Sequence, residues 1–175
     1  MKIYHGSLEV VENPEIRKPG RQLDYGCGFY TTTSYEQAEK LVRNRMRDAN
    51  VKKGYVNIYE YDEEGSKVLQ RLIFNSPGDE WIDFVMANRI KEGFTHNNDI
   101  VYGPVADDRV YTSFILYEGD IIGKDELKKR LKTYKLVDQY LFHTKESLRF
   151  LTYLVGCPVL CSQKQTENHP LLMLI

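Results

Sequence analysis

The segment that most constrains how this chain folds is GCGFYTTTSYEQAEKLV, residues 26–42. Its two glycines permit backbone shapes or close approaches that a side chain would block. Residues 29–33 have the composition of a strand, and Ser34 with Gln37 has the spacing of a capping box. The apolar positions that follow fall on one helical face: Ala38, Leu41, Val42 and Met46. The segment therefore predicts a tight turn, a short strand and a capped helix, which either serve as scaffold or hold Tyr30 at the wall of a pocket.

The rest of the chain mixes strands and helices without a regular βαβ alternation. Strand patterns cover residues 2–5, 55–61, 99–102 and 139–143, and helix patterns cover 79–89, 124–134 and 144–154. Asp79 and Thr144 are the expected N-caps of two of these helices. Residues 108–118 suit either a helix or a strand. We therefore predict an α+β fold with a largely antiparallel sheet and helices at its flanks.

Length and charge indicate a single domain that is not built for polyanions. With 175 residues, 42% of them apolar, the chain is long enough to bury a core. We expect one domain at residues 1–155 and a C-terminal tail at residues 156–175. A net charge of −1 argues against the binding of polyanions through bulk electrostatics.

Cysteine usage and the absence of long apolar runs indicate the compartment. The three cysteines form neither an even disulfide framework nor, with the histidines, a zinc pattern. The first residues lack the apolar region of a signal peptide, and no window approaches the roughly 18 to 20 apolar residues of a membrane helix. We therefore expect a protein of the reducing cytoplasm, with no metal and no membrane partner.

Three short motifs carry side chains that can bind a ligand, and each also has a structural interpretation. In YHGS, His5 can offer a ring nitrogen to a ligand hydroxyl while Gly6 lets the backbone approach a flat polar group. Otherwise His5 is a structural histidine at a strand end. Tyr30 can stack on a planar ring or be a core tyrosine. Gln139 can exchange hydrogen bonds with a ligand hydroxyl or be an ordinary exposed glutamine.

The order of these motifs resembles the ADP-ribosyltransferase superfamily. YHGS with His5, GCGFYTT with Tyr30 and DQYLFHT with Gln139 match the histidine, tyrosine and glutamate positions of its diphtheria-toxin and poly(ADP-ribose) polymerase branch. Residues 1–155 also resemble an uncharacterised bacterial family of small stand-alone domains within that superfamily, DUF3990. The phrases that carry this second likeness are LDYGCGFYTTTSYEQAEKLV, WIDFVMANR, DIVYGPVADDRVY and DQYLFHT.

The resemblance implies a split, mostly antiparallel β-sheet that binds NAD, as a substrate, in the cleft between its halves. His5 would hold a ribose hydroxyl, and Gln139 would bond the nicotinamide ribose near its 2′-hydroxyl. Tyr30 would stack against the nicotinamide or hold the ribose side of its pocket. The glycines and the serine of these motifs complete the implied NAD-binding set: Gly6, Ser7 and Gly28.

Two departures from that branch change what we expect of the site. Gln139 replaces glutamate, and an amide keeps the hydrogen bond but loses the charge that stabilises a cationic transition state. We therefore expect single transfer, or a weak or lost activity, rather than chain elongation. Ala38 stands where the polymerases have a serine that binds the carboxamide, and Leu41 where they have a second stacking tyrosine. The grip on nicotinamide must therefore differ.

The segment GPVADDRVY, residues 103–111, has two interpretations. Its aspartates suit the start of a helix, where the helix dipole favours negative charge. Alternatively the segment lines the cleft, with Arg109 near the pyrophosphate and Asp107 or Asp108 near the acceptor. Arg21 and Arg89 are weaker candidates for phosphate binding.

The sequence thus predicts a mono-ADP-ribosyltransferase that moves ADP-ribose from NAD to an unknown macromolecular acceptor, protein or nucleic acid, and releases nicotinamide. Small size and family analogy suggest the toxin of a bacterial toxin–antitoxin pair, with a cognate antitoxin as partner. Two alternatives stay open. One is a catalytically silent module that holds NAD, ADP-ribose or a partner, and the other is an NAD glycohydrolase that gives the ribosyl cation to water.

Overall fold

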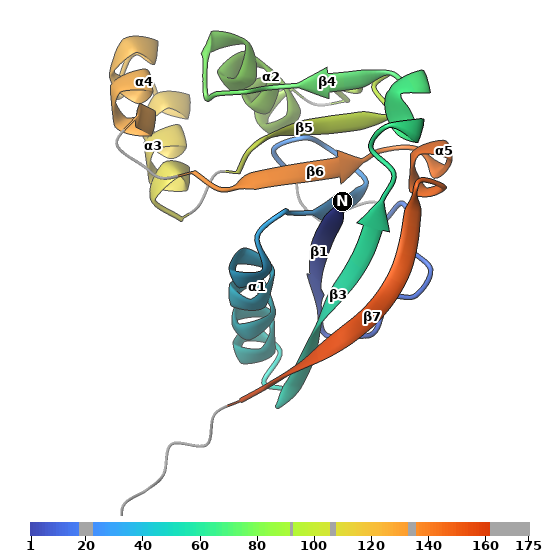
Figure 1. Ribbon diagram of the computed structural model, residues 1–175. Helices are drawn as coiled ribbons and strands as arrows, with labels where there is room; N and C mark the ends of the chain where they lie inside the picture. The colour runs from blue at the N-terminus through green and yellow to red at the C-terminus, as the bar shows by residue number, and fades with distance from the viewer. Residues whose placement is uncertain (18–22, 92, 106–107, 133–135, 162–175) are drawn as a thin grey trace, which may run out of the picture.

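The computed structural model describes residues 1–17, 23–91, 93–105, 108–132 and 136–161, and its strands form two sheets (Figure 1). The first sheet has three antiparallel strands in the order β1-β3-β7. These strands are β1 (Lys2–Ser7), β3 (Lys53–Tyr61) and β7 (Leu151–Leu160). The second sheet runs across the first in Figure 1 and has four strands in the order β2-β6-β5-β4.

The second sheet contains β2 (Phe29–Thr31), β6 (Asp138–Phe142), β5 (Ile100–Pro104) and β4 (Arg71–Ile73). Its strand pairs are antiparallel except for β4 with β5, which is parallel. An isolated bridge joins the two sheets, because Tyr4 N donates to Thr32 O at 2.8 Å and Thr32 N donates to Tyr4 O at 3.0 Å. The predicted α+β fold with a split, mostly antiparallel sheet is therefore confirmed.

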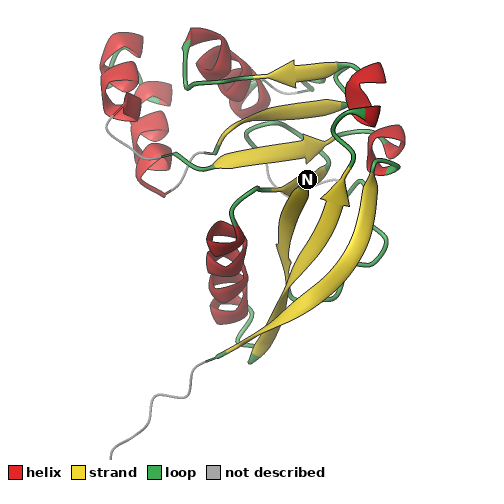
Figure 2. Cartoon of the chain, in the orientation of Figure 1, coloured by secondary structure: helices red, strands yellow, loops and turns green. Residues whose placement is uncertain are grey.

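The helices flank both sheets (Figure 2). Helix α1 (Tyr35–Asp48) contacts β1 and β3 of the three-stranded sheet. Helices α2 (Asp79–Ile90), α3 (Asp108–Glu118) and α4 (Lys124–Lys132) lie beside the four-stranded sheet. Two short elements, α5 (Lys145–Leu148) and the 3-10 helix η1 (Gly65–Val68), lie in connections. Residues 108–118, which suited either a helix or a strand, thus form a helix.

Three clusters of buried apolar side chains fix these elements in place. The cluster between α2–α4 and the four-stranded sheet, named here the helix-side core, includes Trp81, Val101, Phe114, Leu127 and Leu141. The cluster between the two sheets, the inter-sheet core, includes Ile3, Phe29, Tyr59, Tyr140 and Phe142. A third cluster under α1 includes Ala38, Val42, Met46, Val56 and Val159. Full burial of each large apolar side chain contributes roughly 1.5–3 kcal/mol, so these contacts outweigh local preferences.

The start of α1 agrees with the prediction, whereas one of its predicted core positions does not. Ser34 is the N-cap, and its Oγ accepts a hydrogen bond from Gln37 N at 3.2 Å. The positions spaced by four residues are buried: Ala38, Val42 and Met46. Leu41, predicted to share their face, is 41% exposed. A stripe of buried positions four residues apart is narrow, so the side chain one position before it lies outside the buried face.

The predicted N-cap of α2 was wrong by one residue. Gly78 occupies the N-cap position, and Asp79 is the first residue of the helix. The carboxylate of Asp79 lies at the positive end of the helix dipole, and it accepts a hydrogen bond from Lys128 Nζ at 2.7 Å. Aspartate therefore stabilises the helix start through charge rather than through a capping hydrogen bond.

The predicted helix at residues 144–154 was wrong beyond its first turn. Thr144 does cap α5 with a capping box, but the helix ends at Leu148 and β7 begins at Leu151. Residues 151–160 pair with β3 over their full length, so a tertiary partner overrides the local pattern. The expected boundary between residues 155 and 156 therefore falls inside a strand, and residues 156–160 belong to the sheet. Residues 162–175 of the expected tail lie outside the described residues.

Candidate functional site

The turn before β2 is held by three aromatic rings that donate to three successive main-chain carbonyls. The carbonyl oxygens of residues 25–27 contact His96 Nε2 at 3.0 Å, the Tyr30 hydroxyl at 2.7 Å and His143 Nδ1 at 2.6 Å, in that order. Because a carbonyl can only accept, each of these ring atoms carries the proton. Side chains from outside the turn, at residues 30, 96 and 143, thus fix the main chain that precedes Tyr30.

The two histidines of this arrangement lie against each other. Their ring centroids are 4.4 Å apart, and burial lowers the pKa of His96. The strand pattern at residues 139–143 predicts His143 in a strand, and His96 falls between the predicted elements. His96 does lie in a loop, but His143 is the first residue after β6. Both histidines hold the backbone of the turn through hydrogen bonds, and across the described residues no three metal-ligating side chains gather into a group.

The two glycines of the turn serve its close approach to β6. Gly26 and Gly28 have positive φ angles of 89° and 150°, a region that favours glycine. A Cβ atom on Gly28 would collide with the Leu141 side chain and with the Phe142 carbonyl oxygen. Gly28, a predicted NAD-binding residue, therefore lies against the backbone of β6.

Tyr30 is placed by its hydroxyl as well as by its ring. The ring packs against the helix-side core, and burial raises the pKa of the phenol. The hydroxyl donates to Gly26 O at 2.7 Å and accepts from Tyr25 N at 3.3 Å. Both groups of Tyr30 thus take part in the scaffold, and any ligand contact would use the part of the ring that stays accessible.

His5 lies on β1 beside the main chain of β2. Its Nδ1 lies 2.7 Å from the Tyr30 carbonyl oxygen, and its ring centroid lies 4.4 Å from that of Phe29. Burial lowers the pKa of His5 to about 4, so the ring is neutral near pH 7. A neutral ring that donates through Nδ1 keeps an acceptor lone pair on Nε2. His5 therefore presents the tautomer that can accept a hydrogen bond from a ligand hydroxyl.

The two residues after His5 have packing and loop contacts of their own. A Cβ atom on Gly6 would collide with the Ala38 carbonyl oxygen of α1, so glycine lets this helix lie close to β1. The Gly6 carbonyl accepts a hydrogen bond from Arg45 Nη1 at 2.8 Å. The Ser7 hydroxyl accepts one from Glu9 N at 3.2 Å. In the structure the Gly6 carbonyl is thus occupied by α1, and Ser7 organises the following turn.

Gln139 is a buried residue of β6 rather than an exposed one. Its side chain is 8% exposed, and its Nε2 has no hydrogen-bond partner in the described part of the chain. Tyr30 pairs with Leu141, and Leu141 and Gln139 are two residues apart on β6, so Tyr30 and Gln139 face the same side of the sheet. The Gln139 side chain also lowers the raised pKa of the buried Tyr25 phenol, so its amide faces the Tyr25 hydroxyl, and a ligand or a water would share this donor.

The three predicted site residues do not all share one surface. Tyr30 and Gln139 share one face of the four-stranded sheet. His5 contacts Tyr30 through the main-chain carbonyl, and its ring lies instead against Phe29 of the inter-sheet core.

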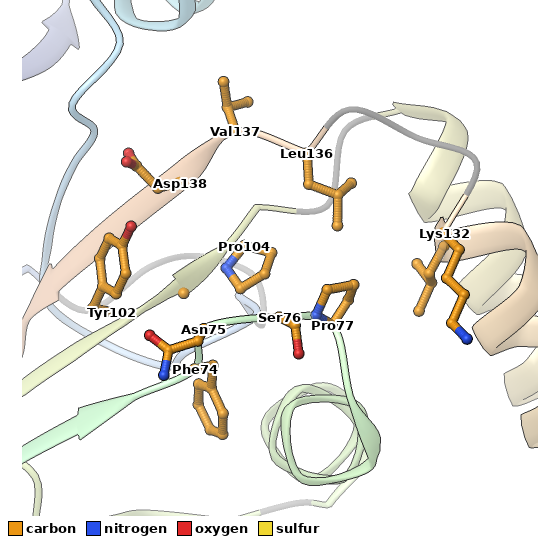
Figure 3. Close-up of a pocket in the computed structure, with 12 residues that line it drawn as sticks. Phe74, Asn75, Ser76, Pro77, Tyr102, Pro104, Lys132, Leu136, Val137 and Asp138 are labelled. Atoms are coloured by element: carbon orange, nitrogen blue, oxygen red, sulfur yellow. The ribbon is translucent and has the colours of Figure 1, made fainter.

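A cavity of about 380 Å³ opens beside Gln139, where β5 ends and β6 begins (Figure 3). Its lining comes from residues 74–77 after β4, residues 102–104 of β5, residues 131–132 of α4 and residues 136–138. Gly103, in this lining, is the register partner of Gln139. A volume of this size suits a small ligand or a single side chain.

Comparison with known families matches residues 1–153 to the model described as "Protein of unknown function (DUF3990)". The chain belongs to the DUF3990 family. The predicted resemblance to that family is therefore confirmed, over nearly the whole of the described fold. No curated protein and no solved structure matches this DUF3990 chain.

Asp138 is a residue of the DUF3990 chain that sequence reasoning missed. Its carboxylate accepts hydrogen bonds from Thr33 N at 2.8 Å, from Thr32 Oγ1 at 3.1 Å and from the Thr33 hydroxyl. It therefore fastens the start of β6 to the link between β2 and α1. The signal in the sequence was the aspartate directly before Gln139 in DQYLFHT.

The charged residues that were predicted to bind phosphate or the acceptor lie outside the described part of the DUF3990 chain, or they pair with other side chains. Arg21 and Asp107 lie outside the described residues, and so do the side chains of Asp108 and Arg109 at the start of α3. Arg89, a weaker phosphate candidate, is 11% exposed and pairs with Asp24 at 3.3 Å and with Glu118 at 2.8 Å. Its charge is thus matched by two carboxylates.

No described helix is both long and apolar enough to cross a bilayer.

Proposed function

We propose that this protein is a mono-ADP-ribosyltransferase that moves ADP-ribose from NAD to a macromolecular acceptor and releases nicotinamide. The observation that carries the proposal is the order of three strands. β1 with His5 is bridged to the chain after β2 with Tyr30, and β2 is paired with β6 and its Gln139. This is the order that the sequence resemblance to ADP-ribosyltransferases implies for a split sheet.

The protonation state of His5 supports this role. A neutral imidazole whose Nδ1 donates to the Tyr30 carbonyl can accept a hydrogen bond at Nε2 from a ribose hydroxyl. Because the backbone fixes the tautomer, no proton has to be moved when the substrate binds. His5 therefore acts as a positioning group for the sugar rather than as an acid or a base.

The amide of Gln139 supports a modest rate of transfer. The bond from ribose C1′ to nicotinamide carries its positive charge on the leaving group, so nicotinamide departs as a neutral molecule with the bonding electron pair. What remains for the protein is to orient the ribose and to stabilise the cationic C1′ until the acceptor nucleophile bonds to it and loses its proton. The buried Nε2 of Gln139 can orient the ribose but supplies no negative charge.

The same residue favours a second candidate function, a silent module that binds NAD or ADP-ribose. Gln139 lacks a carboxylate, and the Gly6 carbonyl is already bonded to Arg45. Such a module would bind the dinucleotide and leave the glycosidic bond intact.

As a transferase, the protein is proposed to be the toxin of a toxin–antitoxin pair, by analogy with small members of the superfamily.

The test is to incubate the protein with adenine-labelled NAD, with and without a cell lysate, and to measure nicotinamide and labelled macromolecules. Transfer predicts label on macromolecules, and free ADP-ribose alone would indicate a glycohydrolase. Binding of NAD without nicotinamide release would leave only the silent module. Gln139→Glu restores the missing carboxylate, and we expect it to release nicotinamide as fast as the native protein or faster. His5→Ala should abolish release while the far-UV circular dichroism stays native.

A further inference from the structure

The cavity beside β6 has a negatively charged end. Asp138 lines it, and the hydrogen bonds that its carboxylate accepts come from neutral groups of Thr32, Thr33 and Tyr102. Within the described residues no lysine or arginine pairs with Asp138. The full negative charge of the carboxylate is therefore present at the wall of the cavity, without a counter-charge beside it.

The pKa values of two tyrosines near this end are raised, which agrees with a negative charge there. Burial raises the pKa of Tyr102, and the charge of Asp138, the hydrogen bond to its carboxylate and, last, the charge of Glu63 raise it further. Burial also raises the pKa of Tyr140, whose ring centroid lies 4.4 Å from that of Tyr102, and Glu63 and Asp138 again add to the shift. The Asp138 carboxylate thus makes this end of the cavity favourable for a cation, and the face of an aromatic ring adds to that preference.

The remaining walls are suited to an apolar stem. They are formed mainly by ring and aliphatic side chains: Phe74, Pro77, Pro104, Leu131, Leu136 and Val137. Figure 3 shows Tyr102 and Asp138 together at one end of the cavity and Lys132 at the other. A ligand with a long apolar stem and a cationic head matches this arrangement, and arginine and lysine side chains have that form.

The pyrophosphate of NAD, in contrast, does not match this cavity. At the Asp138 end it would meet a carboxylate, and among the described lining residues the base, Lys132, lies at the other end. The phosphates of a nucleic acid meet the same repulsion. The cavity therefore differs in charge from a dinucleotide site, although it lies beside Gln139.

We propose that this cavity binds an arginine or lysine side chain of a protein acceptor. That the bound protein is an acceptor of ADP-ribose rests on the function proposed above, whereas the binding of a basic side chain does not. Asp138 directly precedes Gln139, and Gly103 of the lining is the register partner of Gln139. A protein bound in this cavity thus lies next to β6, the strand that is proposed to hold the nicotinamide ribose. The negative charge of Asp138 then favours basic protein segments over nucleic acid.

The test titrates the full chain with Nα-acetyl-arginine amide and Nα-acetyl-lysine amide, followed by NMR or calorimetry. Nα-acetyl-citrulline amide is the matched probe, because it has nearly the shape of arginine without the charge. We expect both basic probes to bind and the citrulline probe to bind at least about tenfold more weakly, as for a charge-assisted contact. Asp138→Asn should weaken the basic probes by about fivefold or more.

Two further variants separate a filled cavity from a damaged fold. Ser76 is an exposed lining residue, so Ser76→Trp should block the cavity without disturbing the threonine contacts of Asp138. Asp125→Asn removes an exposed carboxylate of α4 outside the lining, and it should leave binding unchanged. Equal binding of the citrulline probe, or full binding by Ser76→Trp, would overturn the proposal. Displacement of the probes by a single-stranded oligonucleotide would overturn it in favour of nucleic acid.

Nicotinamide release from NAD, measured on the same preparations, separates this inference from the proposed function. A protein that binds the basic probes but releases no nicotinamide supports the cavity's role and contradicts the transferase. A protein that labels macromolecules equally well with native Ser76 and with Ser76→Trp contradicts the cavity's role and supports the transferase.

Discussion

The hydroxyl of Tyr30 donates a hydrogen bond across 2.7 Å to the carbonyl of Gly26, four residues earlier in the chain. It closes a turn that His96 and His143 hold from two other segments. The residue that the resemblance predicts at the centre of an NAD site is therefore part of the scaffold through its hydroxyl, and the proposed role of the ring can be separated from that of the hydroxyl by removing one atom.

Tyr30→Phe removes that hydroxyl and keeps the ring. We expect a loss of about 1–3 kcal/mol in the free energy of unfolding, because the Gly26 carbonyl and the Tyr25 amide both lose a partner. Urea unfolding measures the change. Tyr55→Phe is the control, since the described residues offer its hydroxyl no partner, and it should stay within about 0.5 kcal/mol of the native protein. Equal stabilities of the two variants would show that the turn does not depend on Tyr30.

The pKa of His5 makes stability depend on pH in a defined window. Burial lowers this pKa to about 4 in the folded protein, against roughly 6.5 for an unfolded histidine. Between these values the unfolded chain binds a proton that the folded chain does not, so stability is lost as pH falls from about 6.5 towards 4, by up to about 1.4 kcal/mol per pH unit. The lowered pKa of His96 acts in the same direction. His5→Asn should flatten this slope in unfolding titrations between pH 4 and pH 7, and an unchanged slope would show that His5 is not its source.

Gly28 is expected to be intolerant of any side chain. Its φ of 150° and the nearness of Leu141 and Phe142 leave no room for a Cβ atom. Gly28→Ala should lower the free energy of unfolding by about 2 kcal/mol or more, through backbone strain and overpacking. Gly123→Ala is the matched control, because a Cβ atom there meets no other atom within 4 Å. Thermal unfolding followed by circular dichroism compares the two, and equal melting temperatures would contradict the close packing of the turn on β6.

Arg89 is expected to stabilise the fold rather than to bind phosphate. It joins α2 to Asp24 and to Glu118 of α3, and its guanidinium lies 5.3 Å from the centre of the Phe114 ring. Arg89→Ala removes the buried positive charge that both carboxylates contact and should cost about 3 kcal/mol in urea unfolding. Arg149→Ala removes an exposed pair with Glu146 and should cost less than about 1 kcal/mol. If Arg89→Ala instead kept its stability and lost NAD binding, the phosphate role would be restored.

Much of the fold could be predicted from local sequence. Ser34 with Gln37 placed the start of α1, and the alternation of YVNIYEY placed β3. These signals are local, because a cap and a strand period depend on residues a few positions apart. The prediction failed at residues 149–154, where a helical pattern gave way to β7, since pairing with β3 depends on a partner about 95 positions away.

The candidate site divides along the same line. The sequence by itself determined which residues are the candidates for its chemistry: a histidine before glycine, a tyrosine after a glycine turn, and a glutamine in place of a carboxylate. Only the tertiary structure decided that the Tyr30 hydroxyl is committed to Gly26, that Gln139 is buried and that Asp138 has no basic partner among the described residues. The physical reason is that residue type fixes what a group can donate or accept, whereas the partner it finds depends on which distant segments the core brings beside it.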